Sequence, residues 1–313
     1  MRRVVVWALV VVSALLSVPA LVRLVGDHGH RPWVFVAVAV PFTFVPLVLL
    51  LAALLALRHP RWAALPAVPL VWIVLWNAPL FVGSSAGSGT GLTVMTANLR
   101  FGAADPFHLV QVVKQRHVDV LATEELTTTE VTNLRGAGLE TELPYFTGTP
   151  DPKDGPDGTG IWSRYPLTPQ AGWSMRYAAP GALVQLPSGA VLVRAVHLAP
   201  PVIDEKGVYR RDYDALLRDV RALPTTSPTV VMGDFNATLD NSVLRLAKGD
   251  RFSDAGEQAG SGLLRTWGQD PGSVKLLYLD HVLVDPRVGV RSTSVVDLPG
   301  SDHAGLIARL VIH

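Results

Sequence analysis

PTVVMGDFNA, at residues 228–237, is the stretch that decides the fold of this chain. Its apolar start is typical of a buried strand, and Asp234 and Asn236 follow at the point where that strand ends. LYLDHVLVD, at residues 277–285, is a second apolar stretch, and Asp280 interrupts it. Functional side chains commonly lie on loops that a rigid sheet holds, so we expect these polar residues to share one edge of a sheet.

The same pattern, an apolar strand that ends in a polar residue, recurs in the flanking sequence. The further predicted strands are LTVMTANL (92–99), VDVLAT (118–123), GTGIWSR (158–164), a hairpin that turns at PSG (182–198) and GLIARLVIH (305–313). Helical periodicity predicts one helix that begins near residue 107 and one over 209–223. The polar residues at the strand ends are Asn98, Glu125, His197, Asp302 and His303. Many strands with few helices predict two packed sheets with helices outside them.

These polar residues have the chemistry of a site for a hard cation and a phosphate. Carboxylate and amide oxygens are the ligands that Mg²⁺ prefers in proteins. Histidines beside such a site can act as a general base and as hydrogen-bond donors to phosphate. Cysteine is absent from the chain, which excludes disulfides, zinc–thiolate sites, iron–sulfur clusters and cysteine nucleophiles.

The order of the motifs resembles that of the endonuclease/exonuclease/phosphatase superfamily. This superfamily includes AP endonucleases of the exonuclease III type, DNase I, neutral sphingomyelinases and inositol-polyphosphate 5-phosphatases. The motifs that carry the resemblance are TANL, DVLATEE, GTGIWSRYPL, VHLAPP, GDFNA, LDHVLV and SDHAGL. The resemblance spans residues 92–313. It implies a DNase I-like, four-layer αββα sandwich that hydrolyses phosphoesters with Mg²⁺ or Mn²⁺.

A metal site is also implied by the resemblance. Glu125 corresponds to the principal metal ligand, Asn98 lies beside the metal, and Asp302 is a second candidate ligand. Members of the superfamily usually carry Gln before the metal-binding Glu, whereas this chain has Glu124. Adjacent residues of a strand point to opposite faces. We therefore expect Glu124 to face solvent rather than to strengthen metal binding.

The catalytic roles that the resemblance implies fall on five further residues. Asp234 orients and activates the attacking water, and Asn236 contacts the phosphate or the nucleophile. His303 is the catalytic histidine, and Asp280 positions it through a carboxylate–imidazole hydrogen bond. His197 donates a hydrogen bond to a non-bridging phosphate oxygen.

Two choices remain open from the residues themselves. Arg164 is a candidate for binding a second phosphate group, as is Arg210 or Arg211, and a surface ion pair is an equally good interpretation because exposed arginine is common. His281 follows Asp280 on a strand whose alternate positions are apolar, so one of the two faces the site and the other faces away. We expect Asp280 to face the site.

The first 91 residues have the composition of a membrane protein. They hold six arginines, no lysine and one acid, a net charge of +5, whereas residues 92–313 carry 21 basic and 25 acidic residues, a net charge of −4. The whole chain is 49% hydrophobic and only 17% charged, against about 25% charged residues in average proteins. A bilayer core requires about 20 apolar residues of helix. Three apolar stretches of that length predict transmembrane helices at 4–25, 33–57 and 62–82.

Residues 1–82 are therefore predicted to be a membrane domain, which a Gly/Ser linker at 83–91 joins to a catalytic domain at 92–313. Two further spans and the lack of an A-x-A site favour an uncleaved anchor over a cleaved signal peptide. Arginines precede the first span and lie between the second and third. By the positive-inside rule they predict a multi-pass protein of the cell membrane, with a cytoplasmic N-terminus and an extracytoplasmic catalytic domain. Three spans before such a domain also resemble the VanJ-like teicoplanin-resistance membrane proteins of actinomycetes.

The tether beside a bilayer and the net acidity of the catalytic domain favour a phosphorylated membrane lipid as substrate, such as a polyprenyl phosphate carrier. The VanJ-like resemblance adds a link to glycopeptide resistance. One alternative is a membrane-tethered extracellular nuclease, which is less favoured because nucleic-acid-binding domains are usually basic. Another is a non-catalytic binding protein on the same scaffold, against which the intact set of polar residues argues. The sequence indicates no protein partner.

Overall fold

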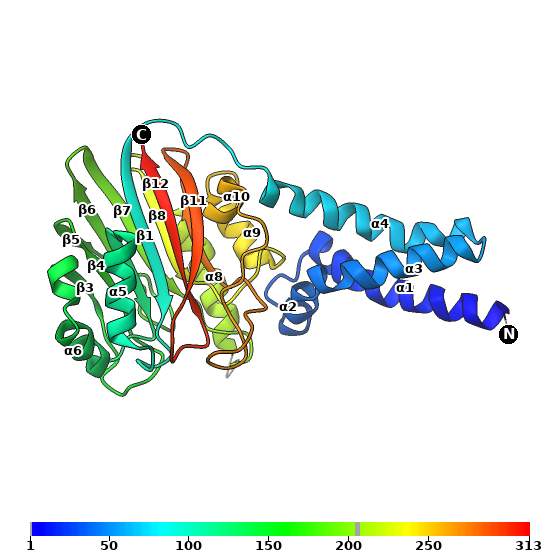
Figure 1. Cartoon of the computed structure of the whole chain (residues 1–313), viewed down its shortest axis with the longest axis horizontal. Coiled ribbons are helices and arrows are strands. Elements are labelled where there is room, and N and C mark those ends of the chain that lie inside the picture. Colours follow the sequence, from blue (N-terminus) through cyan, green and yellow to red (C-terminus); the bar gives the residue numbers. More distant parts are fainter. Residues whose placement is uncertain (1, 204–206) are drawn as a thin grey trace. The chain divides into compact units, whose positions relative to one another are not determined.

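The computed structural model describes residues 2–203 and 207–313, and Figure 1 shows their course. The chain divides into two compact units. The helical unit comprises the residues up to Pro79 together with Leu239–Arg245, and the sheet unit comprises Leu80–Thr238 and Leu246–His313. The short stretch 239–245 therefore belongs with the N-terminal helices, although the sequence places it in the predicted catalytic domain.

Four helices form the N-terminal part of the helical unit, and two of them are long and apolar enough to cross a membrane. These helices are α1 (Arg2–Val25), α2 (Arg31–Val38), α3 (Phe44–Ala56) and α4 (Pro60–Asn77). The two candidate spans are Arg3–Val25 and Pro60–Phe81, the second of which adds the 3₁₀ turn η2 (Ala78–Phe81) to α4. The helices predicted at 4–25 and 62–82 thus form with shifts of a few residues.

The single helix expected over 33–57 is broken, which corrects the prediction. α2 and α3 are bent by 49° and are joined by the 3₁₀ turn η1 (Val40–Thr43). Pro41 lies in this turn. Proline lacks the backbone N–H that an α-helix uses and clashes with the preceding turn, so a helix tends to kink or break there.

The predicted Gly/Ser linker at 83–91 is partly built into the sheet unit. Thr90 and Gly91 already belong to the first strand. The backbone N–H of Ser84 donates to the carbonyl oxygen of Gln258 at 2.9 Å. The connecting segment is therefore shorter than its composition indicates.

Two six-stranded sheets form the core of the sheet unit. The first has the order β11 (Val288–Asp297), β12 (Ala304–Ile312), β1 (Thr90–Asn98), β2 (Val120–Glu124), β4 (Thr159–Ser163), β3 (Tyr145–Thr149). The second has the order β5 (Leu167–Gln170), β6 (Gly181–Leu186), β7 (Gly189–His197), β8 (Thr229–Asp234), β10 (Asp280–Val284), β9 (Ser253–Asp254). Every strand predicted from the sequence is among them.

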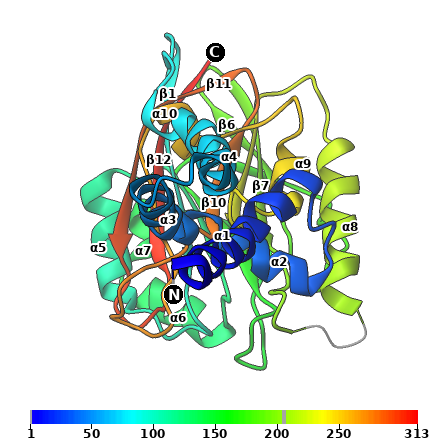
Figure 2. The ribbon, with the colours of Figure 1, turned by 90° about the vertical axis from the view of Figure 1, so that its right-hand side faces the viewer.

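Helices cover the outer faces of the two sheets, as Figure 2 shows for α5 (Pro106–Arg116) and α8 (Val208–Arg221) on opposite sides. α5 packs with α6 (Thr128–Gly136) and α7 (Leu139–Glu142) on the first sheet through a buried apolar cluster. α8 buries its tyrosines and leucines and exposes its arginines. Two short helices, α9 (Ser242–Lys248) and α10 (Ala255–Ala259), complete the described elements. The predicted DNase I-like sandwich is confirmed.

The register of the strands brings their polar ends together. β1 and β2 run parallel, with Asn98 opposite Glu124. β7 and β8 also run parallel, with His197 opposite Asp234, and antiparallel β10 places Asp280 opposite the same Asp234. Each sheet therefore presents its polar residues where its central strands end.

Candidate active site

Asn98 links the two sheets at this edge. The side chain is 1% exposed, and its Nδ2 donates to Oδ2 of Asp234 at 3.0 Å and to Oε1 of Glu125 at 3.1 Å. Glu125 follows β2 with a left-handed φ of +53° and accepts a hydrogen bond on Oε2 from the N–H of Phe101 at 3.0 Å. The amide of Asn98 thus fixes two carboxylates that come from different sheets.

The loop after β8 is shaped by its own side chains. The N–H of Asn236 donates to Oδ1 of Asp234 at 2.8 Å, and its Nδ2 donates to the carbonyl of Leu198 at 2.8 Å. Gly233, just before, has a φ of +145°, and a Cβ there would lie 1.9 Å from the carbonyl oxygen of Val196. The GDFN motif therefore needs glycine so that β8 can approach β7 closely.

His303 and Asp280 form a buried pair. Nδ1 of His303 lies 2.8 Å from Oδ2 of Asp280, and Nε2 lies 3.6 Å from Oδ2 of Asp234. Burial lowers the pKa of His303, but the negative charges of Asp280 and Asp234 outweigh this effect and raise it to about 10. The imidazole is therefore cationic at neutral pH, and its Nε2–H, which lies beside Asp234, is the donor that can face a phosphate or a leaving group.

His197 has the opposite charge state. Its Nε2 lies 3.8 Å from Oε1 of Glu125 and 3.8 Å from Oδ2 of Asp234, and its ring stacks on Tyr177 with centroids 4.4 Å apart. Burial, reinforced by the nearby positive charge of His303, lowers the pKa of His197 to about 3. His197 is thus a neutral ring at the site.

The carboxylates of the site are held in an environment that disfavours their negative charge. Burial raises the pKa of Asp234 to about 7, against the lowering effect of His303. Burial also raises the pKa of Glu125, and the charge of Asp302 adds to this. Crowded, poorly solvated carboxylates are the setting in which a cation is most favourable.

The residues present fit a divalent metal. Asp234 and Asp280 offer carboxylate oxygens that lie within 4.8 Å of each other, and the cationic His303 completes this buried cluster without serving as a ligand. Glu125, with a side chain 15% exposed, and Asp302, with a side chain 22% exposed, supply carboxylates closer to solvent. A donor set made of carboxylate oxygens suits Mg²⁺ or Mn²⁺.

The sequence pattern of the Endonuclease/Exonuclease/phosphatase family matches residues 95–303, which is most of the chain. The chain belongs to this family. No curated protein gives a significant match.

Solved structures of the family share the fold at low identity. A family member from Beutenbergia cavernae is 18% identical with a TM-score of 0.56, over 71% of this chain and 72% of that one. The mannosyl-6-phosphatase of Bacteroides thetaiotaomicron is 18% identical with a TM-score of 0.55, over 71% and 100%. TDP2 of D. rerio, complexed with single-strand DNA product, is 17% identical with a TM-score of 0.57, over 71% and 99%. Family members are phosphatases and nucleases, which supports hydrolase activity for this chain.

Glu124 does not face solvent, and the expectation that it does is wrong. The residue is fully buried, and both its carboxylate oxygens lie 3.0 Å from the hydroxyl of Thr96, which donates to them. Burial and the charge of Asp280 raise its pKa well above the usual range. Glu125 follows β2 with a left-handed φ, so strand alternation does not set the direction of its side chain, and Glu124 lies near enough to Asp280 and Asp234 of the second sheet for their charges to raise its pKa.

Arg164 lies away from the site. It follows β4 beside the start of β2, where its Nε donates to Oδ1 of Asp119 at 3.1 Å and its Nη2 to the carbonyl of Val118 at 3.0 Å. Strands β2 and β4 are antiparallel, so Glu124 at the other end of β2 is four residues further on. Of the other arginine candidates, Arg210 pairs with Asp214 along α8.

His281 lies on the opposite face of β10 from Asp280. Its Nδ1 lies 2.8 Å from Oδ2 of Asp254, and its Nε2 lies 2.9 Å from the carbonyl oxygen of Ala237. A carbonyl oxygen only accepts, so Nε2 carries a proton. His281 thus supports the GDFNA loop from behind instead of entering the site.

Two supporting residues were missed from the sequence. The hydroxyl of Ser301 donates to the carbonyl of Asn98 at 2.8 Å and accepts from the N–H of His303 at 3.0 Å, so it connects the two motifs. Its position directly before Asp302 and His303 in the SDHAGL motif is the feature of the sequence that could have indicated this supporting role. Tyr177, which stacks on His197, lies in a segment without a motif.

Proposed function

We propose that this protein is a metal-dependent phosphoesterase that hydrolyses a phosphate ester or pyrophosphate of a membrane lipid, of the polyprenyl phosphate carrier type, at the outer face of the cell membrane. The observation that carries the hydrolytic part is the Asn98 bridge between Glu125 and Asp234, beside the buried His303–Asp280 pair. This set brings a candidate metal ligand, a base and a cationic donor within reach of one phosphate.

In this proposal, the charge of each side chain determines its role in hydrolysis. Asp234 orients a water for attack on phosphorus and accepts its proton, a role that suits a carboxylate with a pKa raised to about 7. His303, held by Asp280, donates from Nε2 to the phosphate or to the leaving oxygen. His197 and Asn236 contact the non-bridging phosphate oxygens. Each of these contacts becomes stronger as negative charge develops.

Mg²⁺ or Mn²⁺ completes this arrangement in the proposal. Glu125 is its principal ligand, with Asn98 beside it and Asp302 as a second carboxylate. When bound, such an ion neutralises charge on the phosphate and polarises the P–O bond.

The composition of the chain and the apolar helices that would tether it to a membrane support a lipid substrate. Two helices of the chain are long and apolar enough to cross a membrane, and the broken helix pair α2–α3 can provide a third span. The sheet unit is acidic overall, which disfavours nucleic acid. Arginines at the N-terminus and between α3 and α4 support a cytoplasmic N-terminus and an extracytoplasmic sheet unit. By the VanJ-like resemblance, we further propose a role in glycopeptide resistance.

Hydrolysis of three substrates, compared side by side, tests the reaction, with phosphate release, phenol release and strand nicking as the respective readouts. Purified full-length protein is assayed with Mg²⁺ on undecaprenyl pyrophosphate, on a bis-aryl phosphodiester and on supercoiled DNA. We expect the highest kcat/KM for the pyrophosphate and none after chelation with EDTA. Faster nicking of DNA would favour a tethered nuclease instead. Absence of turnover on all three would favour a non-catalytic binding protein.

The orientation is tested separately. A phosphatase reporter that is active only outside the cytoplasm, fused to the C-terminus, should be active in intact cells. Activity of a cytoplasm-only reporter at the same position would contradict the outer location. Expression in a teicoplanin-sensitive host, compared with a Glu125→Ala variant, checks the resistance role.

A further inference from the structure

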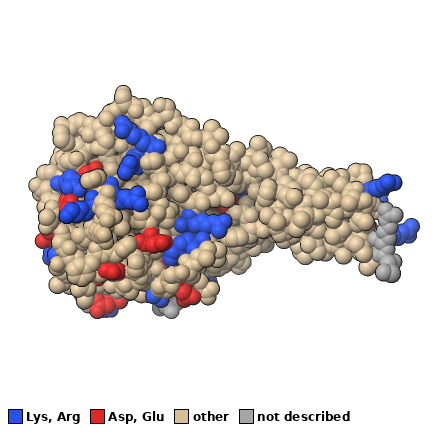
Figure 3. Space-filling model, viewed as in Figure 1, with Lys and Arg blue, Asp and Glu red and all other residues tan. Residues whose placement is uncertain are grey.

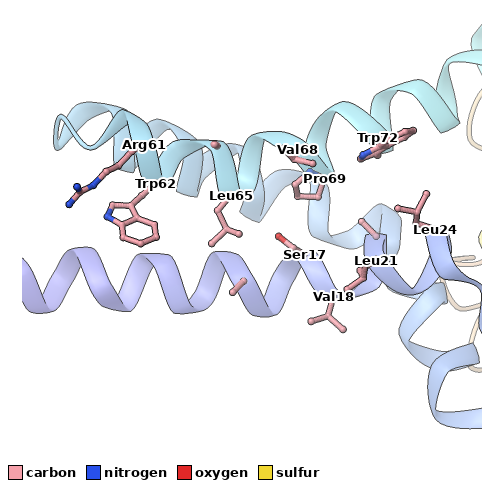
Figure 4. A pocket seen from close by; sticks show the side chains of 13 residues that line it. Ser17, Val18, Leu21, Leu24, Arg61, Trp62, Leu65, Val68, Pro69 and Trp72 are labelled. Carbon is pink, nitrogen blue, oxygen red and sulfur yellow. The ribbon is translucent and has the colours of Figure 1, made fainter.

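An apolar groove of about 660 Å³ runs between α1 and α4 in the helical unit (Figure 4). α1 lines it from Ala14 to Leu24, and α4 lines it from Arg61 to Trp72. Ser17 carries the one hydroxyl among the described lining residues, and this hydroxyl donates to a backbone carbonyl of its own helix at 2.7 Å. The groove therefore offers hydrocarbon contact along most of its length, and its remaining polar groups are the Arg61 guanidinium and the indole N–H groups of Trp62 and Trp72.

A second cavity of about 750 Å³ adjoins the groove and has a basic lining. Arg3, Arg58, His59 and Arg61 line it, and it shares Arg61 and Trp62 with the groove. The guanidinium of Arg61 lies over the Trp62 ring, 5.6 Å from its centroid. In Figure 4, Arg61 and Trp62 lie together at one end of the groove. The two cavities are thus neighbours, one apolar and one basic, with Arg61 and Trp62 lining both, and we refer to the pair as the composite site.

The cationic part has no nearby acid in its own unit to neutralise it. The acidic residues of the helical unit are Asp27 and Asp240. Asp27 follows the C-terminus of α1, whereas Arg3 lies in its first turn. At 1.5 Å per residue, these positions are roughly 35 Å apart along the helix. Figure 3 shows Lys and Arg atoms, and no Asp or Glu atoms, at that end of the unit on the visible face.

The turn that carries the arginines is built at a conformational cost. Arg58 follows the last residues of α3 with a φ of +61°, where glycine is the usual residue. His59 then precedes Pro60, which opens α4 with its φ already fixed. Non-glycine residues in the left-handed region persist where the surroundings require them. The turn therefore presents Arg58 and Arg61 in a defined arrangement on either side of His59.

We propose that this composite site binds one anionic glycerophospholipid, with its phosphate against Arg58 and Arg61 and an acyl chain in the groove, an assignment that rests on the proposed membrane location of the helical unit. Arginine binds phosphate through two parallel hydrogen bonds. Basic pockets between transmembrane helices on the cytoplasmic side bind acidic lipid headgroups, and tryptophan is enriched at the same level of the membrane. The acyl chain supplies the packing that α1 and α4 lack along the groove.

Lipid retention by the full-length protein tests the proposal. The protein is reconstituted with equal amounts of phosphatidylglycerol and phosphatidylcholine, extracted in mild detergent and analysed by native mass spectrometry. We expect one retained phosphatidylglycerol per chain. In an Arg58→Gln/Arg61→Gln variant the preference for phosphatidylglycerol should fall about 30-fold, because each arginine near a membrane surface contributes about fivefold. An Arg31→Gln variant, changed in the same unit but outside both cavities, is the matched control.

Further variants and ligands separate the acyl-chain contacts from the headgroup contacts. Ala14→Phe fills the groove and should lose the lipid while the arginines remain. Equal retention of the two lipids by the wild type, or an unchanged preference in the double variant, overturns the proposal. Release of the lipid by excess inorganic phosphate would indicate a site for free phosphate instead. Stronger retention of undecaprenyl phosphate would assign the groove to the substrate. Loss of phosphoesterase activity in every assay would refute the proposed function and leave this measurement unaffected.

Discussion

Replacement of Asp280 by Asn should destabilise the sheet unit as well as slow catalysis. Oδ2 of Asp280 lies 2.8 Å from Nδ1 of His303, and both side chains are buried. Asn keeps the shape of the side chain but removes the carboxylate charge that is hydrogen-bonded to Nδ1, so that Asp234, 3.6 Å from Nε2, is left as a more distant counter-charge. Removal of one partner from a buried ion pair costs roughly 3–5 kcal/mol. Each kcal/mol lowers Tm by about 2–4 °C in a domain of this size. We therefore expect a fall on the order of 10 °C in a thermal unfolding scan.

The size of this effect should depend on pH in a definite direction. The pKa of His303 is raised to about 10, because the charges of Asp280 and Asp234 outweigh the effect of burial. A histidine whose pKa rises on folding adds stability that is fully present below its unfolded pKa of about 6.5 and is lost as pH rises through the folded value. The difference in Tm between wild type and Asp280→Asn should thus be largest near pH 6 and shrink toward pH 10. Asp214→Asn, on the exposed face of α8, is the matched control.

Turnover provides the second measurement on the same pair. His303→Ala should lose roughly 10²–10⁴-fold in kcat, the usual contribution of general acid–base catalysis. The double variant with Asp280→Asn should be little worse than the worse single variant, because the two residues serve one step. An unchanged Tm at pH 6 together with strictly multiplicative rate losses would refute the pairing. If Asp280→Asn kept the normal rate while His281→Ala was inactive, the active site would have to lie on the other face of β10.

Three further predictions concern single side chains. Glu125→Ala should abolish Mg²⁺-dependent turnover and leave the circular dichroism spectrum unchanged. Glu140→Ala, at an exposed position of α7, is the control and should keep both the turnover and the spectrum of the wild type. Wild-type turnover in Glu125→Ala would contradict the assigned metal site. Glu124→Gln should raise Tm in EDTA, and the rise should be larger at pH 8 than at pH 5. Burial raises the pKa of Glu124, so the protonated form that the fold favours is lost as pH rises. A lower Tm of the variant at pH 8 would mean that the structure needs the carboxylate. Arg164→Ala should leave kcat/KM unchanged, since its partners are Asp119, Val118 and Glu142, whereas a large rise in KM would indicate that Arg164 contacts the substrate.

The sequence by itself determined the elements whose pattern is local. Apolar runs that end in Asn98, His197 and Asp234 form strands with those residues at their last position. The amphipathic stretch 209–223 forms α8 with a shift of one or two residues. Backbone hydrogen bonding and hydrophobic periodicity act over a few residues, so they can be predicted from the neighbouring sequence alone. The weakly patterned elements β3, β5, β9 and β11 were not predicted, because they depend on partner strands for their stability.

Tertiary structure alone decided which polar residues meet and how each is charged. Asn98 and Asp234 are 136 residues apart, yet their hydrogen bond joins the two sheets, and its existence depends on how the sheets stack. Glu124 is buried beside Thr96 and near the carboxylates of the second sheet, and nothing in the LATEE motif indicates that environment. His303 and His197 have the same ordinary pKa, but one is raised to about 10 and the other lowered to about 3. Burial penalises charge in both, and the carboxylates of Asp280 and Asp234, which the fold brings to His303, reverse that penalty there.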